Sequence, residues 1–75
     1  MSTEEKDKIL EIIADGLGVA KEELQPQLSL RDDLGGDSLD LIEIIMSIEK
    51  EFGVSVSDEQ YDNINTVDDV LNLIV

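Results

Sequence analysis

Apolar residues recur every three or four positions near the start of the chain, a spacing that places side chains on one face of a helix. The recurring positions are Ile9, Ile12, Ile13 and Leu17. Ser2 and Glu5 have capping-box spacing, in which the serine hydroxyl and the glutamate carboxylate each accept a backbone N–H from the other residue. We therefore expect a helix that begins after Ser2 and ends at Gly16 or Gly18.

The segment 38–52 carries two apolar stripes. At about 100° per residue, the first covers roughly one third of the helix circumference and is expected to face the core. Its members are Leu41, Ile44, Ile45, Ile48 and Phe52. The second is centred roughly 130° away and consists of Leu39, Ile42 and Met46. Charged residues border it, so we interpret it as an exposed recognition face; burial of the helix on all sides is the alternative.

Two further helices are expected in the last third of the chain. Ser57 with Gln60, and Thr66 with Asp69, repeat the capping spacing. The apolar face of the last helix consists of Val67, Val70, Leu71 and Ile74.

A long connection, residues 19–37, contains the only proline and joins the first two helices. Its leucines are spaced to reach the core repeatedly, which indicates an ordered loop with one helical turn near residues 21–24. These leucines are Leu24, Leu28, Leu30 and Leu34. The whole pattern predicts one domain, residues 1–75, with an all-α fold: a four-helix bundle with three longer helices, one short helix and a long first loop.

Charge narrows the classes of partner. The net charge is −14, and it is uneven. Seven acids and four bases give residues 1–31 a charge of −3, whereas twelve acids and only Lys50 give residues 32–75 a charge of −11. Such a surface repels nucleic acid and anionic lipid and attracts basic protein surfaces. The sequence shows no signal peptide and no apolar run long enough for membrane insertion, so we expect a cytoplasmic or organelle-matrix protein. We also expect a monomer.

Candidate chemistry is concentrated where the loop meets the second helix. Asp37 suits an N-cap, which makes Ser38 the first helical residue and places its hydroxyl at the helix N-terminus. The partial positive charge there favours an anionic group such as a phosphodiester. Gly36 is expected to leave room for a bulky group to approach the hydroxyl.

In its motif Leu34-Gly35-Gly36-Asp37-Ser38-Leu39-Asp40, and in its length, acidity and helical layout, the chain resembles the acyl carrier proteins. The resemblance implies that Ser38 carries 4′-phosphopantetheine, derived from coenzyme A, and that acyl intermediates of fatty acid or related biosynthesis are held on it as thioesters. The implied partners are a phosphopantetheinyl transferase and acyl-processing enzymes with basic docking patches. The residues that match the family's contact positions are Asp37, Leu39, Asp40, Ile42, Glu43, Met46 and Glu49. Residues expected to line an acyl pocket are Ile45, Ile48, Tyr61 and Ile64.

Several positions depart from the family's usual pattern, among them Ser57, where the family often has proline. Gly36 stands where the fatty-acid carriers usually have alanine, and the Gly35-Gly36 pair is more typical of peptide-synthetase carrier domains. An aminoacyl or polyketide carrier of a specialised pathway is therefore the alternative within the same class. Lys50 replaces a commonly acidic residue, and Tyr61 replaces a typically small one, where it is expected to cover the entrance between helices.

Other functions fit the residues less well. Catalysis by Ser38 requires a base, but the chain has no histidine and lacks the Gly-x-Ser-x-Gly elbow, so we expect no enzyme activity. The acids around Gly35 do not have the spacing of an EF-hand, and we expect no dedicated metal site. An accessory subunit that binds through the second helix, or an acidic regulatory or ion-buffering protein with Ser38 unmodified, remains an alternative of a different class.

Overall fold

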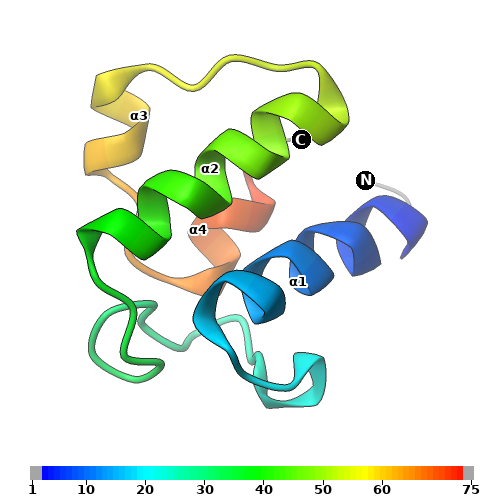
Figure 1. Ribbon diagram of the computed structural model, residues 1–75, viewed down its shortest axis with the longest axis vertical. Coiled ribbons are helices and arrows are strands. Elements are labelled where there is room, and N and C mark those ends of the chain that lie inside the picture. Colours follow the sequence, from blue (N-terminus) through cyan, green and yellow to red (C-terminus); the bar gives the residue numbers. More distant parts are fainter. Residues whose placement is uncertain (1–2, 74–75) are drawn as a thin grey trace.

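Two helices of 15 residues, α1 (Thr3–Leu17) and α2 (Ser38–Phe52), pack against each other in the computed structural model, which describes residues 3–73 (Figure 1). Two helices of five residues follow, α3 (Asp58–Asp62) and α4 (Val67–Leu71). The long first loop contains a single 3-10 turn, η1 (Lys21–Glu23). No β-strand occurs in the described residues, so the predicted all-α fold with four helices is confirmed.

The helix lengths differ from the expectation in one respect. The fourth helix, expected among the longer ones, spans five residues within the described part of the chain. After Leu71 the backbone tightens, and the N–H of Leu73 bonds to the carbonyl of Val70, three residues back, at 3.1 Å. This is the 3-10 geometry that often closes a helix. Ser2 and Ile74, to which we assigned a cap and a core position, lie outside the described residues.

The core lies between α1, α2, α4 and the long loop. The first stripe of α2 faces it as predicted: its four isoleucine and leucine residues are buried and Phe52 is half-buried. The fully buried large side chains are Ile9, Ile13, Leu30, Ile44, Ile48, Val67 and Val70. Burying aliphatic side chains of this size is the main source of stability in a domain without disulfides.

The long loop is ordered because it bonds to the segment that leads into α4. Ser29 and Thr66 form an isolated antiparallel bridge, and the N–H of Leu30 bonds to the carbonyl of Asn65 at 2.9 Å. The Asp33 carboxylate accepts the N–H of Ser29 at 2.7 Å, which closes the loop on itself. These bonds fix the path by which the loop delivers Ser38 to the start of α2.

Asp69 contributes a pH-dependent part of the stability. Backbone N–H groups of Thr66 and Asn65, each 2.9 Å from its carboxylate, lower the pKa of Asp69 below its ordinary value of 3.8, the Thr66 bond having the largest effect. A carboxyl group whose pKa is lower in the folded than in the unfolded protein stabilises the fold at pH values above its unfolded-state pKa. This contribution is lost as the pH falls through its folded-state pKa.

We expect Asp69→Asn to lower the free energy of unfolding by about 1 kcal/mol at neutral pH, since hydrogen bonds to a charged acceptor are stronger than those to a neutral one. In urea titrations the difference from the native protein should shrink below about pH 4; a constant difference would contradict this account.

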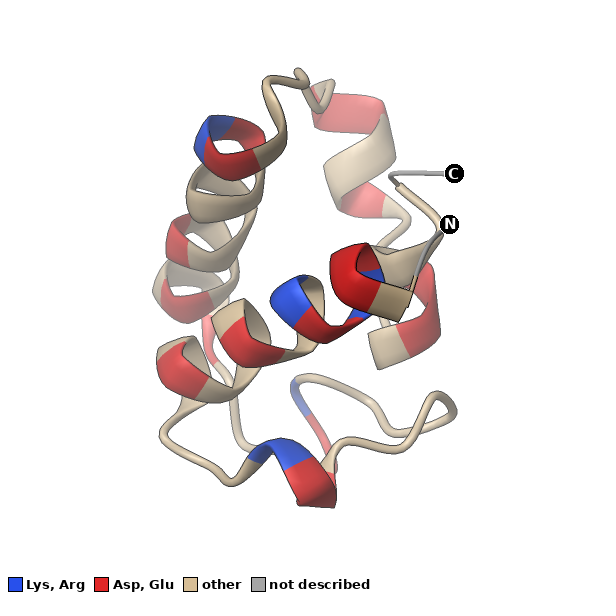
Figure 2. Ribbon diagram, turned by 90° about the vertical axis from the view of Figure 1, so that its right-hand side faces the viewer, with Lys and Arg blue, Asp and Glu red and all other residues tan. Residues whose placement is uncertain are grey.

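Acidic side chains lie on every helix, and few cations oppose them (Figure 2). Two ion pairs among the described residues lie at the surface: Lys8 with Glu51 at 3.4 Å and Lys21, which is half-buried, with Asp7 at 3.7 Å. Ion pairs at the surface contribute little to stability, so repulsion among the carboxylates is left uncompensated.

We expect the melting temperature to rise by several degrees between about 0.01 and 0.15 M salt, since screening shortens the range of this repulsion. A melting temperature independent of salt would show that the charges are compensated locally.

Candidate functional site

A reciprocal pair of hydrogen bonds sets the start of α2. The Asp37 carboxylate accepts the N–H of Asp40 at 2.9 Å, and the Asp40 carboxylate accepts the N–H of Asp37 at 3.2 Å. The predicted cap is therefore confirmed, and Ser38 is the first residue of the helix. Ser38 is exposed, and its hydroxyl makes no hydrogen bond within the described chain. A free hydroxyl at a helix N-terminus fits the attachment of an anionic group.

Gly36 has a different role from the expected one. Its N–H bonds to the carbonyl of Leu30 at 2.8 Å, and the residue is buried. A Cβ at this position would lie 2.6 Å from the Leu17 side chain and 2.9 Å from the Leu30 carbonyl oxygen. The space left by the missing side chain is therefore used by the packing of the loop against its own backbone, not by the approach of a group to the Ser38 hydroxyl.

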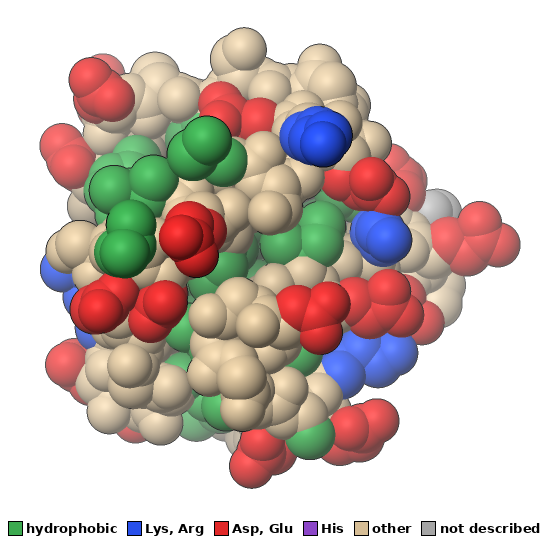
Figure 3. Space-filling model, in the orientation of Figure 1, with side chains coloured by type: hydrophobic (Ala, Val, Ile, Leu, Met, Phe, Trp, Pro, Cys, Tyr) green, Lys and Arg blue, Asp and Glu red, His purple; other side chains and the backbone are tan. Residues whose placement is uncertain are grey.

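The second stripe of α2 is exposed. Leu39 is 62% exposed, Ile42 44% and Met46 61%. The space-filling view shows a hydrophobic patch over α2 with Asp and Glu side chains at its edge (Figure 3). The prediction that this stripe is exposed in the monomer is confirmed, and burial of α2 on all sides is excluded. Hydrophobic groups within an acidic surround are typical of a protein contact surface.

The acids assigned to partner contacts are not equally free. Asp37 and Asp40 bond to each other's backbone, and the Glu49 carboxylate accepts the N–H of Val56 at 2.9 Å. Glu49 thus holds the segment that crosses from α2 to α3. Glu43 is exposed and has neither a hydrogen bond nor an ion pair to its carboxylate in the described chain. Of the acids on this face, Glu43 can therefore pair with a cation of a partner without giving up a hydrogen bond within the described chain.

A groove between α2 and α3 opens beside the patch. It has a volume of about 330 Å³. Its lining consists of Ile42, Ile45, Met46, Glu49, Val56, Asp58 and Tyr61. Of the residues expected to line an acyl pocket, Ile45 and Tyr61 lie here, whereas Ile48 is fully buried in the core. Ile64 borders a second hollow, of about 470 Å³, together with Arg31, Tyr61, Asp62 and Asn65.

Sequence reasoning missed a bond between Tyr61 and the start of α2. The Tyr61 hydroxyl donates to the carbonyl of Ser38 at 3.3 Å, across 23 positions of the sequence. It also missed Val56 in the groove, although the alternating segment Val54-Ser55-Val56 signals a side chain directed inward.

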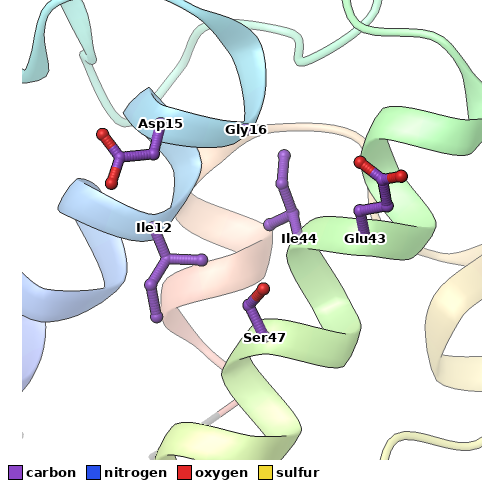
Figure 4. A pocket seen from close by; sticks show the side chains of 6 residues that line it. All are labelled: Ile12, Asp15, Gly16, Glu43, Ile44 and Ser47. Atoms are coloured by element: carbon purple, nitrogen blue, oxygen red, sulfur yellow. The ribbon is translucent and has the colours of Figure 1, made fainter.

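A hollow of about 260 Å³ lies on another face of α2, against α1 (Figure 4). Ile12, Asp15 and Gly16 line it from α1, and Glu43, Ile44 and Ser47 from α2. Ile44 points toward Gly16, where a Cβ would lie 2.5 Å from the Ile44 side chain, so the glycine lets the two helices approach closely. The hollow contains none of the residues expected to line the acyl pocket.

Residues 3–73 include no cluster of three side chains able to hold a metal ion, and no helix there is long and apolar enough to cross a membrane.

The chain is similar to known proteins over most of its length. A family model described as the phosphopantetheine attachment site matches residues 7–74. Among solved structures, the chain is similar to an acyl carrier protein from Enterococcus faecalis, with a TM-score of 0.80 and 33% identity. The match covers 96% of this chain and 91% of that one.

Proposed function

This chain belongs to the acyl carrier protein family, whose cofactor is 4′-phosphopantetheine, and we propose that Ser38 is the residue that carries it. The observation that supports this assignment is the exposed Ser38 hydroxyl, free of hydrogen bonds, at the N-terminus of a 15-residue helix. The bound group supplies a terminal thiol on which acyl groups are held as thioesters. The protein's own residues orient the attachment point and offer surfaces to cargo and partners.

The chain contributes to cofactor attachment by positioning Ser38. The capping box of Asp37 and Asp40 fixes the first turn of α2. The loop before this turn is held by its bond to the Asn65 carbonyl and by the Asp33 carboxylate, which accepts a backbone N–H of the same loop. The helix dipole stabilises the phosphodiester anion that attachment to Ser38 creates. We propose that the partner transferase provides the base that accepts the serine proton, since the chain has no histidine.

Mass spectrometry of the intact protein tests attachment. Purified apo protein, incubated with coenzyme A and a broad-specificity phosphopantetheinyl transferase, is expected to gain one phosphopantetheine mass. Circular dichroism on the same sample must show a folded helical protein. A folded protein that gains no mass would defeat the proposal and favour the accessory-subunit alternative.

We propose that partners dock on the exposed stripe and the acids around it: Asp37, Leu39, Asp40, Ile42, Glu43, Met46 and Glu49. A partner surface with apolar groups surrounded by Lys and Arg complements this face. Lys50 lies at its edge, on the last turn of α2.

Glu43→Gln is expected to raise the KM of the transferase for this protein about two- to fivefold with little change in kcat, because rim charges mainly affect encounter. The fold should be unaffected, since the Glu43 carboxylate bonds to nothing in the described chain. Glu11→Gln is the matched control: it removes the same charge from an exposed position of α1. Equal effects of the two substitutions would show that net charge, not docking on α2, controls the encounter.

For cargo, we propose acyl intermediates of fatty acid or related biosynthesis, sheltered in the groove that Ile45 and Tyr61 line. The proposal does not extend to Ile48, which lies in the core, or to Ile64, which borders the other hollow. Support comes from the apolar groove that Ile45 and Tyr61 line beside the attachment residue. The Gly35-Gly36 pair keeps an aminoacyl or polyketide carrier of a specialised pathway as the alternative.

A further inference from the structure

The space between α2 and α3 is bridged by side chains. Within these described helices, no Cα atom of α2 comes within 8 Å of a Cα atom of α3. Figure 1 shows α3 standing apart from α2 at the end of the crossing segment. The groove of about 330 Å³ occupies this interval. Side chains, rather than the backbones of the two helices, therefore bound the groove, and a substitution of one of them changes the volume of the groove.

Tyr61 spans the interval and is held at both ends. Its backbone belongs to α3, where the Tyr61 N–H bonds to the carbonyl of Ser57 at 2.9 Å. Its hydroxyl bonds to the Ser38 carbonyl at 3.3 Å, and the residue is half-buried against the core. The ring is thus placed immediately beside the residue proposed to carry the arm.

Tyr61 also separates two hollows of different character. It is the one residue that lines both the groove and the second hollow in the described structure. On the groove side its neighbours are mainly apolar, among them Ile42, Ile45, Met46 and Val56. On the other side they are mainly polar: Arg31, Asp62 and Asn65, with Ile64. Tyr61 therefore borders both spaces.

We propose that Tyr61 limits the length of acyl chain that this protein shelters, because its side chain lies between the apolar groove and the hollow that Ile64 borders. The inference rests on the proposed function and concerns cargo selection. A chain longer than the groove must leave it or displace the ring, and neither adds buried apolar surface. Removing the ring joins the groove to the hollow that Ile64 borders, so longer chains find further apolar contact.

Thermal stability of loaded protein measures the limit. A transferase installs butyryl, hexanoyl, octanoyl, decanoyl or dodecanoyl phosphopantetheine from the corresponding acyl-coenzyme A, and circular dichroism gives the melting temperature. Each sheltered pair of methylenes should raise it by a few degrees, since burial stabilises only the folded state. For the native protein the gain should level off at a short chain. For Tyr61→Ala it should continue for about two carbons or more, because a lost ring leaves space that apolar groups fill.

Tyr61→Phe is the matched control. It keeps the ring and loses only the hydroxyl, so its gain should level off at the native chain length. Circular dichroism of the unloaded variants checks their folding, and Tyr61→Leu replaces Tyr61→Ala if the latter does not fold. If folded native and Ala or Leu variants level off at the same length, or if Tyr61→Phe follows Tyr61→Ala, the ring does not limit chain length and the inference is overturned.

A second series does not depend on any transferase. The native chain has no cysteine, so Ser38→Cys introduces a unique thiol. Its thiolate attacks the sulfenyl sulfur of an alkyl methanethiosulfonate, which forms a disulfide to the alkyl chain and releases methanesulfinate. The melting temperatures of this alkyl series are compared as above, in the Ser38→Cys protein with and without the further substitution Tyr61→Ala. These melting temperatures test the role of the Tyr61 ring even if incubation with coenzyme A adds no mass. A failure of cofactor attachment at Ser38 is therefore distinguished from a failure of Tyr61 to limit chain length.

Discussion

Ile48→Asp is expected to unfold the protein, whereas Ile42→Asp on the same helix is expected to leave it folded. Ile48 is 0% exposed in the middle of the core stripe, and Ile42 is 44% exposed on the outer stripe. Burying an unpaired carboxylate costs several kcal/mol, which is comparable with the roughly 5–15 kcal/mol of stability of a small domain. At position 42 the carboxylate stays in water, so the cost to folding is small.

The folded variant should nevertheless lose function. Ile42→Asp is expected to slow attachment of the cofactor, because a partner that covers the stripe must desolvate the new carboxylate. Circular dichroism melts on both variants and transferase kinetics on the folded one measure these effects. If Ile42→Asp melts like Ile48→Asp, α2 is buried on both faces and the docking face does not exist. If it folds and is modified at the native rate, the stripe is exposed but is not used by the transferase.

Gly36→Ala is expected to destabilise the protein by about 1–3 kcal/mol, the usual cost of adding atoms to a filled site. The new methyl group would lie 2.9 Å from the Leu30 carbonyl oxygen, which is backbone and cannot rotate away as the nearby Leu17 side chain can. For a domain of this size the melting temperature should fall by about 5–20 °C. Ser47→Ala, at an exposed position of α2, is the control for a small change near the same helix.

The same substitution should also slow cofactor attachment, because the bond from the Gly36 N–H to Leu30 fixes the loop two residues before Ser38. An unchanged melting temperature in Gly36→Ala would show that the loop adjusts at little cost and that the close contact with Leu30 is not required.

The boundaries of α2 were predictable because their signals are local. Asp37 caps the helix from one residue away, and the chain ends it at Gly53, where the backbone is left-handed. The caps at Ser57 and Thr66 follow the same short-range rule and are also confirmed. The two stripes of α2 follow from helix geometry alone, so their burial and exposure were predictable as well.

Interactions that depend on the path of the loops were not predictable. The bond from Tyr61 to Ser38 requires knowledge of how residues 53–57 cross from α2 to α3. The role of Gly36 depends on where the Leu30 carbonyl lies, which no local pattern specifies. Glu49 was expected only as a partner contact, because it matches a contact position of the family that the chain resembles. That it also holds Val56 is visible only in three dimensions.

The most direct measurement of the central claim is the location of the cofactor on the chain. Trypsin cleaves after Arg31 and Lys50 and releases the peptide 32–50, in which Ser38 and Ser47 are the only hydroxyl residues. Tandem mass spectrometry of protein treated with transferase and coenzyme A is expected to find phosphopantetheine on Ser38, and Ser47→Ala should be modified as the native protein is. Modification of Ser47, of another peptide, or of a folded Ser38→Ala protein would contradict the account.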